Sequence, residues 1–210
     1  MFLLPSISVL PQYAEILTRT QSGDVLLDLG CCFGQDLRLL ASDGAPLRNV
    51  YASDISNELW NLGFELFKDR DKMPAKFIQA NILDPESDLG QLKGRVDLII
   101  ANQFLHLFDW NGQIMAMKKI VELSRPGSCV VGYQRSQMPA KVVPGPWGDM
   151  YFHDQDSFRK VWQQVESETE SEWEVEAAIV DLSEWGMEKE DTDWMPEGRK
   201  GINFSAKRRR

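Results

Sequence analysis

The sequence predicts an α/β protein with a doubly wound, mostly parallel seven-stranded sheet and an antiparallel hairpin at one edge. Three observations support this fold class. Apolar runs of strand length alternate with helical segments as far as residue 133. A turn containing glycine follows the first of these strands and opens a helix. The C-terminal region instead holds two strand-like segments without an obvious helix between them, which is typical of an antiparallel sheet edge.

The first helix is expected to begin near Pro11 and to end at Gly23, because proline suits the first helical position and glycine a helix end. Five compact apolar runs then have the length of buried strands. These strands are predicted at residues 25–29, 49–53, 75–79, 96–101 and 128–133, with helices at 35–41, 57–69 and 112–123. The helix over 57–69 is strongly amphipathic, and its apolar positions near the 3.6-residue period are Leu59, Trp60, Phe64 and Phe67.

The C-terminal elements differ in kind. A long loop rich in proline and glycine is expected over residues 139–148, and a helix over 155–165. Residues 172–177 alternate between charged and apolar side chains, as a strand with one wet face does. Residues 201–206 are predicted to form the last strand, and the basic residues 207–210 a frayed tail.

The size and charge of the chain limit the classes of function that it can have. Its 210 residues fit a single domain over 1–210. The 32 acidic and 23 basic residues give a net charge of −9, which argues against a nucleic-acid partner. Three cysteines, two of them adjacent, match neither a disulfide framework nor a metal site, so we expect a cytoplasmic protein without a metal ion. No apolar run is long enough for a membrane span, and the apolar start lacks the basic region of a signal peptide.

The main chemical motif is the turn Asp28-Leu-Gly30-Cys-Cys-Phe-Gly34 between the first strand and its helix. Asp54 ends the second strand, 20 residues after Gly34, where a carboxylate can accept hydrogen bonds from both ribose hydroxyls of an adenosine. A dinucleotide site needs G-x-G-x-x-G, which fails here at Cys32 and Gln35. The pattern D-x-G-x-G-x-G of S-adenosylmethionine sites fails only at Cys32. The Cys31-Cys32 pair is interpreted as a steric fit to the turn rather than as a nucleophile.

With these residues the chain resembles the class I S-adenosylmethionine-dependent methyltransferases. The segments 27–38, 43–46 and 63–70 are similar to small fungal methyltransferases of secondary metabolism, including those that act on meroterpenoid acids. The resemblance implies a Rossmann-like methyltransferase fold, S-adenosylmethionine as cofactor, and methyl transfer to a carboxylate or phenolic oxygen of a small polyketide- or terpenoid-derived molecule.

The same resemblance implies the residues of the cofactor site. Gly30 and the backbone near it would meet the methionine part of the cofactor, and Asp54 its ribose. The other residues implied are Asp28, Cys31 and Gly34 in the turn, Ile55, Asn81 and Ile82 beside the adenine, and Asn102 and Gln103 beside the methionine.

The acceptor side is less defined. His106 follows the fourth strand and is interpreted either as a general base for a hydroxyl acceptor or as a packing residue. Trp147, Tyr151 and His153 are candidate substrate contacts. With Phe152 and Trp162 the two aromatic residues form either an apolar wall or a second small core.

Members of the family carry several helices before the first strand, whereas about twenty residues precede Val25 here, so we expect a shortened N-terminal lid. The apolar residues within 2–10 then either close the site through a homodimer or fold back over their own sheet. Two other functions stay open: a cyclase or isomerase that only binds the cofactor, and a non-catalytic partner subunit.

Overall fold

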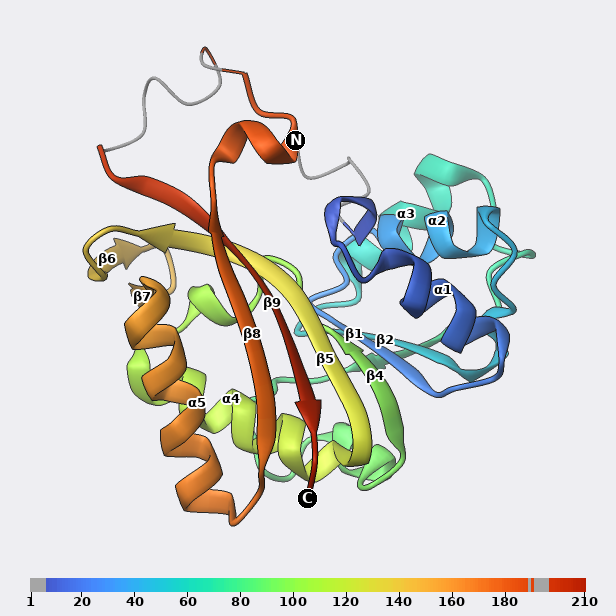
Figure 1. Cartoon of the computed structure of the whole chain (residues 1–210). Helices are drawn as coiled ribbons and strands as arrows, with labels where there is room; N and C mark the ends of the chain where they lie inside the picture. The colour runs from blue at the N-terminus through green and yellow to red at the C-terminus, as the bar shows by residue number, and fades with distance from the viewer. Residues whose placement is uncertain (1–6, 189, 191–196) are drawn as a thin grey trace.

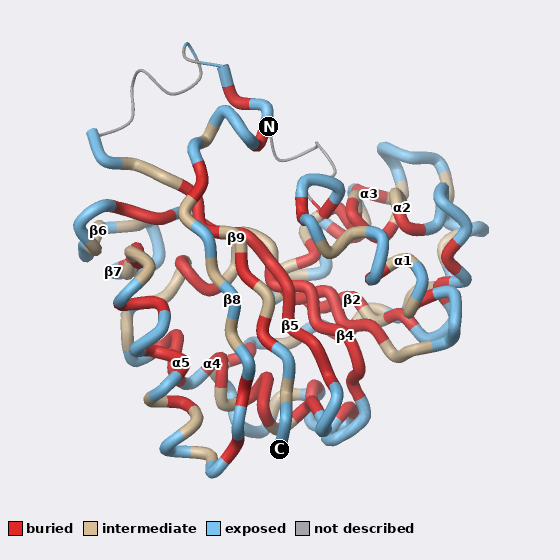
Figure 2. Tube along the Cα trace, in the orientation of Figure 1, coloured by how far each residue is buried: buried red, intermediate tan, exposed pale blue. Residues whose placement is uncertain are grey.

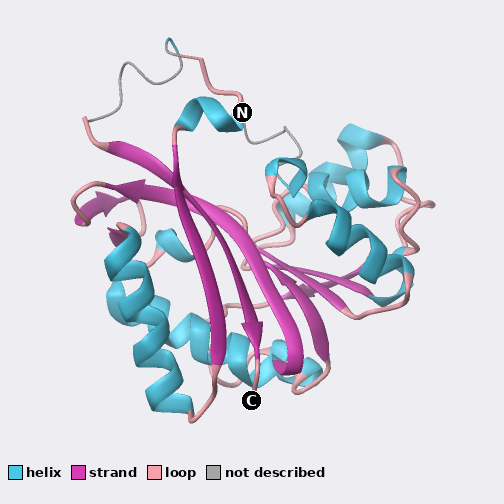
Figure 3. Ribbon diagram, in the orientation of Figure 1, coloured by secondary structure: helices cyan, strands magenta, loops and turns pink. Residues whose placement is uncertain are grey.

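A computed structural model describes residues 7–188, 190 and 197–210 of the chain. Seven strands form one sheet in the order β3-β2-β1-β4-β5-β9-β8 (Figures 1 and 3). Neighbouring strands from β3 to β5 are parallel, while β9 is antiparallel to both β5 and β8. This arrangement confirms the predicted fold class, including the antiparallel edge.

The elements keep the predicted order. The strands of the main sheet are β1 (Leu26–Leu29), β2 (Val50–Asp54), β3 (Lys76–Gln79), β4 (Val96–Ile100), β5 (Ser124–Gln137), β8 (Trp173–Val180) and β9 (Arg199–Arg208). The α-helices are α1 (Tyr13–Gln21), α2 (Gln35–Ser42), α3 (Glu58–Phe67), α4 (Trp110–Leu123) and α5 (Gln155–Thr169). Short 3-10 helices are η1 (Ile7–Val9), η2 (Leu47–Asn49), η3 (Asp88–Leu92), η4 (Leu105–Leu107) and η5 (Leu182–Trp185).

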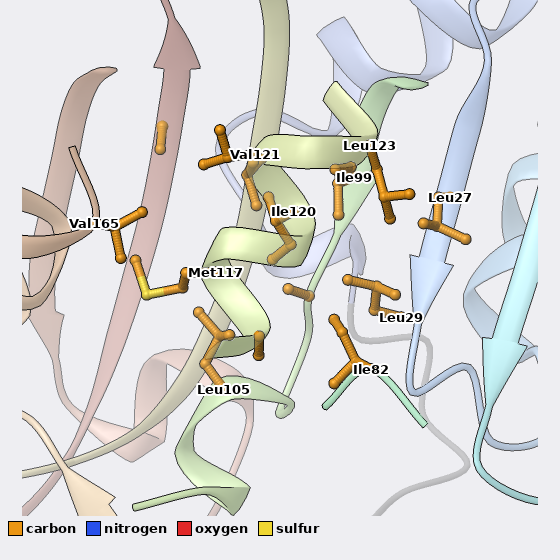
Figure 4. Packing of buried hydrophobic residues seen from close by; sticks show 14 of the residues in the cluster. Leu27, Leu29, Ile82, Ile99, Leu105, Met117, Ile120, Val121, Leu123 and Val165 are labelled. Carbon is orange, nitrogen blue, oxygen red and sulfur yellow. The ribbon is translucent and has the colours of Figure 1, made fainter. Parts of the chain in front are cut away.

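The sheet is covered on both faces, because alternate side chains of each buried strand point in opposite directions. Leu27 and Leu29 of β1 pack in the cluster formed with α4 and α5, and Leu26 packs in the cluster formed with α1, α2 and α3. Figure 1 shows α4 and α5 on one side of the sheet and α1 to α3 on the other, and the central strands are buried in Figure 2. In Figure 4, Met117 and Ile120 of α4 lie among the side chains of the first of these clusters.

The order of the strands indicates where a binding crevice is expected. The order reverses between β1 and β4, because the chain runs from β1 outward through β2 to β3 and then returns to the other side of β1. In open α/β sheets, ligands bind outside the carboxyl ends of the strands at such a point. The predicted turn after β1 and the segment after β4 both lie there.

Four predictions about elements were wrong. The predicted loop over 139–148 forms a two-stranded hairpin, β6 (Lys141–Gly145) and β7 (Gly148–Phe152). Strand β5 begins at Ser124, since a register shift against β4 accommodates residues 125–127. The C-terminal basic residues are not a frayed tail, because Arg208 donates hydrogen bonds to the carbonyls of Val121 and Ser124. On α3, two of the predicted apolar positions, Leu59 and Phe67, face solvent and are exposed.

The first described residues pack on the same chain. Ile7 and Leu10 are buried with α1 and α2, and the Ile7 amide donates to Asp36 Oδ1 at 3.1 Å. For residues 7–10, the structure therefore supports the alternative in which they fold back. Phe2, Leu3 and Leu4, which entered the same prediction, lie outside the described residues.

Among the described residues, no helix has the length and apolar character that crossing a membrane requires. Likewise, no group of three or more histidine, cysteine or acidic side chains within the described ranges is placed to hold a metal ion.

Candidate functional site

The turn after β1 is held by backbone hydrogen bonds at the end of β2. The amides of Gly30 and Cys31 both donate to the Ser53 carbonyl, at 2.8 and 3.1 Å. Gly30 and Gly34 each have a φ of 69°. A Cβ at Gly30 would lie 2.7 Å from the Phe104 ring, and one at Gly34 would lie 2.5 Å from the Trp60 ring. Both glycines are therefore required by conformation and by close packing.

Cys32 stands where the S-adenosylmethionine pattern has its middle glycine. Its φ of 51° is one that glycine adopts more easily, yet a cysteine side chain is accommodated there, half-buried. The Cys32 amide donates to Asp54 Oδ2 at 3.0 Å, and the Ile55 amide donates to Asp54 Oδ1 at 2.8 Å. The departure from the pattern thus leaves the turn intact and fixes the Asp54 carboxylate beside it.

Three carboxylates gather around this turn. Asp28 is buried at the end of β1, and burial, Asp36 and Asp54 together raise its pKa well above the usual range. The raised pKa favours the neutral form of Asp28, so the acidic character of the turn comes mainly from Asp36 and Asp54. These acidic side chains disfavour a pyrophosphate and favour a cationic ligand. S-adenosylmethionine carries a sulfonium and an ammonium group, so the charge of the turn fits this cofactor better than a dinucleotide.

The residues after β4 complete the crevice. Asn102 Nδ2 donates to Asp36 Oδ2 at 3.0 Å, which connects this segment to the carboxylates of the turn. Gln103 adopts a φ of 50°, and its amide donates to the Tyr133 carbonyl at 2.7 Å. Within the described residues, the buried Gln103 Oε1 has no hydrogen-bond partner. Asn102 is thus connected to the turn through Asp36, and Gln103 has a buried acceptor that a ligand could use, while their place beside the methionine part stays a prediction.

The two segments predicted beside the adenine differ in what they expose. Ile55 is 67% exposed next to the Asp54 carboxylate, so its side chain is open to a flat apolar ligand. The Ala80 amide donates to the Asp54 carbonyl at 2.9 Å, which holds the following residues close. Asn81 Oδ1 accepts from the Leu83 amide at 3.0 Å, while the Ile82 side chain is buried in the α4 cluster beside Leu29 (Figure 4). Ile82 can therefore meet a ligand only through its backbone.

His106 lies on η4, where its ring packs against Phe152 at a centroid distance of 5.6 Å. The side chain is buried, and its Nδ1 lacks a hydrogen-bond partner among the described residues. Burial, Arg135 and Arg199 lower its pKa to about 3. His106 is therefore neutral at neutral pH and a poor proton acceptor, which weakens its interpretation as a general base.

The structure shows what surrounds each candidate substrate contact. His153 Nδ1 lies 3.1 Å from Ser157 Oγ and its Nε2 lies 3.0 Å from Gln113 Oε1, so both ring nitrogens serve the packing of β7 on α4 and α5. Trp147 is 81% exposed in the turn of the β6–β7 hairpin. Tyr151 packs on Trp110 at a ring distance of 5.2 Å. Trp162 lies in the main core, whereas Trp147 is exposed, which weakens the interpretation of these residues as one aromatic wall. Substrate contact by Trp147, Tyr151 and His153 stays a prediction.

Three residues near the crevice were missed or undervalued in the sequence. Phe152 is fully buried between His106 and Arg199, whose guanidinium lies 4.8 Å from the Phe152 ring centre. Arg135 and Arg199 belong to the ends of β5 and β9 that extend beyond the predicted strands. Longer strands could have been anticipated only from their pairing, which the local sequence does not reveal.

Comparison with known proteins places this geometry in a family. A model described as a methyltransferase domain matches residues 26–127. The chain is 37% identical to O-methyltransferase phiE of a fungal species (strain ATCC 74256), over 99% of the chain and 74% of that protein. It is 42% identical to the Asnovolin E/Chermesin D methyltransferase nvfJ of Aspergillus novofumigatus, over 83% of the chain and 65% of that protein. O-methyltransferase atr3 of Stereocaulon alpinum is 37% identical, over 99% of the chain and 61% of its own length. The chain thus spans between 61% and 74% of these relatives.

Solved structures agree on the fold. The [4+2]-cyclase SpnF superposes with a TM-score of 0.65 at 13% identity, covering 93% of the chain and 80% of SpnF. The 1,6-didemethyltoxoflavin-N1-methyltransferase of Burkholderia thailandensis, whose structure holds S-adenosylhomocysteine, gives 0.63 at 14% identity, covering 98% and 77%. At such low identities the likeness concerns the fold alone.

Proposed function

We propose, from the premise that this chain belongs to the S-adenosylmethionine-dependent methyltransferases, that it transfers a methyl group to an oxygen atom of a small secondary metabolite. The observation that carries the proposal is the turn after β1, where two constrained glycines meet the carboxylates of Asp28 and Asp54 at the switch point of the sheet. Two of its relatives are named O-methyltransferases, which supports oxygen as the acceptor atom.

Different residues of the crevice would bind different parts of the cofactor. Asp54 would accept hydrogen bonds from the ribose, and Ile55 would cover one face of the adenine. The backbone at Gly30 and Cys31, with Gln103 Oε1, would hold the methionine part. Bound there, S-adenosylmethionine supplies a methyl group activated by a positive sulfur. The acidic side chains around Asp28 would stabilise the positive sulfur of the bound cofactor before the reaction. The main contribution of the protein to the transfer itself would then be to orient the acceptor.

The acceptor oxygen is proposed to be a carboxylate rather than a phenol. A phenol has a pKa near ~10 and needs a base at neutral pH. His106 is ill-suited to that role, because its pKa is lowered to about 3. A carboxylate is already ionised and needs no base. The half-buried ring of Phe104 and the buried rings of His106 and Phe152 would then serve to exclude water from the reacting oxygen.

The test uses S-adenosylmethionine with a deuterated methyl group and a panel of polyketide and terpenoid acids, each paired with the matching phenol or alcohol. Mass spectrometry should find labelled methyl esters of acids. Labelled ethers of phenols only would contradict the carboxylate assignment. A rearranged product of unchanged mass would favour a cyclase. Cofactor binding without any product from the panel or from pathway extracts would favour a non-catalytic partner.

A further inference from the structure

Two arginines lie side by side on one face of the sheet, near the crevice. In the β5–β9 register, Arg135 opposes Gly201 and Arg199 opposes Gln137, so the two arginines are diagonal neighbours. Diagonal pairs on one face of a sheet have Cβ atoms about 7 Å apart, within reach for long side chains. Two positive groups this close repel each other unless an anion lies between them.

Neither arginine has an acidic partner within the described part of the chain. Arg199 is half-buried, and its Nε is shielded from solvent without a hydrogen-bond acceptor in the described residues. Burial and Arg135 lower the pKa of Arg199. Five arginines do pair with carboxylates of the described residues: Arg19 with Asp24, Arg38 with Asp69, Arg125 with Asp97, Arg159 with Asp156 and Arg209 with Glu174. In a chain of net charge −9, the lack of an acidic partner for the half-buried Arg199 among the described residues does not reflect a shortage of acids.

The pair adjoins the proposed reaction site. Arg135 is two residues beyond Tyr133, whose carbonyl accepts the Gln103 amide in the segment after β4. Arg199 lies over the ring of Phe152, which packs on His106. The pair therefore borders the same strand ends as the cofactor turn, with buried apolar rings between them.

We propose that Arg135 and Arg199 together bind the carboxylate of the acceptor and select an acid over its neutral ester. This inference rests on the proposed function. Guanidinium groups form charge-assisted, often bidentate hydrogen bonds with carboxylates, which supply both affinity and orientation. When a carboxylate oxygen takes the methyl group from the sulfonium, the anion becomes a neutral ester and the sulfonium a neutral thioether. The product thus loses the charge that the arginines recognise, and its release is favoured.

The test measures binding rather than turnover. The full chain, saturated with S-adenosylhomocysteine, is titrated by ligand-observed NMR with 2-naphthoate and with its methyl ester. We expect Arg135→Gln and Arg199→Gln each to weaken naphthoate binding by tenfold or more, and Arg199→Lys to weaken it less. Arg159→Gln, which removes an exposed arginine of α5, is the matched control and should bind as the wild type does. The ester should bind weakly and equally to all variants.

Calorimetry with S-adenosylhomocysteine separates the possible sources of the carboxylate. Unchanged cofactor affinity in the arginine variants is expected, because the pair serves the acceptor. A fall in that affinity would instead assign the pair to the methionine carboxylate and overturn the proposal. The proposal would also be overturned if naphthoate binds the wild type no better than its methyl ester does. The same holds if naphthoate binds both arginine variants as tightly as it binds the wild type. A wild type that binds no S-adenosylhomocysteine would contradict the proposed function, while the naphthoate titration without cofactor would still decide the role of the pair.

Discussion

Asp54 is the residue on which cofactor binding should depend most. Two hydrogen bonds from ribose hydroxyls to its carboxylate contribute roughly 2–3 kcal/mol, so Asp54→Ala should weaken S-adenosylmethionine binding about 30- to 150-fold. Calorimetry measures this directly. Asp156→Ala, at an exposed position of α5, is the control and should leave the affinity unchanged. Equal affinity of a folded Asp54→Ala variant would remove the ribose assignment.

His106 should make the protein sensitive to acid. Its pKa is about 3 in the folded chain and about 6.5 in an unfolded one, so below pH 6.5 only the unfolded chain takes up this proton. The contribution of neutral, buried His106 to the free energy of unfolding is therefore complete above pH 6.5 and is lost as the pH falls toward 3. Between pH 6.5 and 5 the loss is on the order of 2 kcal/mol. Urea unfolding at several pH values should show a smaller loss in His106→Gln. An identical pH dependence in both proteins would contradict the burial of a neutral histidine.

For single residues, the sequence indicates the cofactor side of the site more directly than the acceptor side. Gly30, Asp54 and Gln103 are placed by the ends of consecutive parallel strands, which a local pattern reveals. His153 depends not only on the nearby Ser157 but also on Gln113 of α4, which is distant in the sequence, so its packing role could not be seen. Arg135 and Arg199 meet only through strand pairing.

Among the elements, the C-terminal end of β9 should stabilise the fold more than a free tail would. Arg208 Nη1 donates to the carbonyls of Val121 at 2.7 Å and Ser124 at 2.8 Å, where α4 passes into β5. Arg208→Met keeps the apolar part of the side chain but removes the guanidinium that donates both hydrogen bonds, so the free energy of unfolding should fall by about 1–3 kcal/mol. Urea denaturation checks this value, with Arg210→Met as the control. Equal midpoints for Arg208→Met and the wild type would return residues 207–210 to the frayed tail that the sequence suggested.

The predictability of an element depended on how local its signal is. Strands β1 to β4 are short, those of the sheet centre (β1 and β4) are buried throughout, and all four were predicted almost to the residue. The β6–β7 hairpin contains Pro144 and Pro146 and was taken for a loop, because its pairing partner is not visible in a local pattern. On α3, Leu59 and Phe67 are exposed although the apolar period is correct, since the sheet covers only the side that carries Trp60 and Gly63.

For the whole molecule, the sequence left two interpretations of the apolar N-terminal residues: a homodimer that closes the site, or a segment that folds back. Ile7 is 0% exposed and Leu10 is buried within the chain, so these two residues are not free to form a subunit interface. A homodimer stays a proposal for this protein. Its interface would have to consist of residues other than Ile7 and Leu10.

The folded-back segment also connects the N-terminal residues to the cofactor site. The Ile7 amide donates to Asp36 Oδ1, and Asp36 Oδ2 accepts from Asn102 beside the turn. Ile7→Asp places a charge in an apolar cluster next to that carboxylate. We therefore expect the free energy of unfolding to fall by at least about 3 kcal/mol and S-adenosylhomocysteine to bind more weakly.

The control for this variant is Val9→Asp, at a position on the solvent side of η1, which should change neither quantity appreciably. Light scattering after size exclusion completes the test, because an intrachain role predicts the same mass for the Ile7→Asp variant and the wild type. If the wild type is instead a dimer that Ile7→Asp dissociates while the unfolding free energy of the chain is unchanged, then Ile7 contacts a second copy and the fold-back interpretation is wrong. A loss of stability at constant mass assigns η1 to the wall of its own cofactor site.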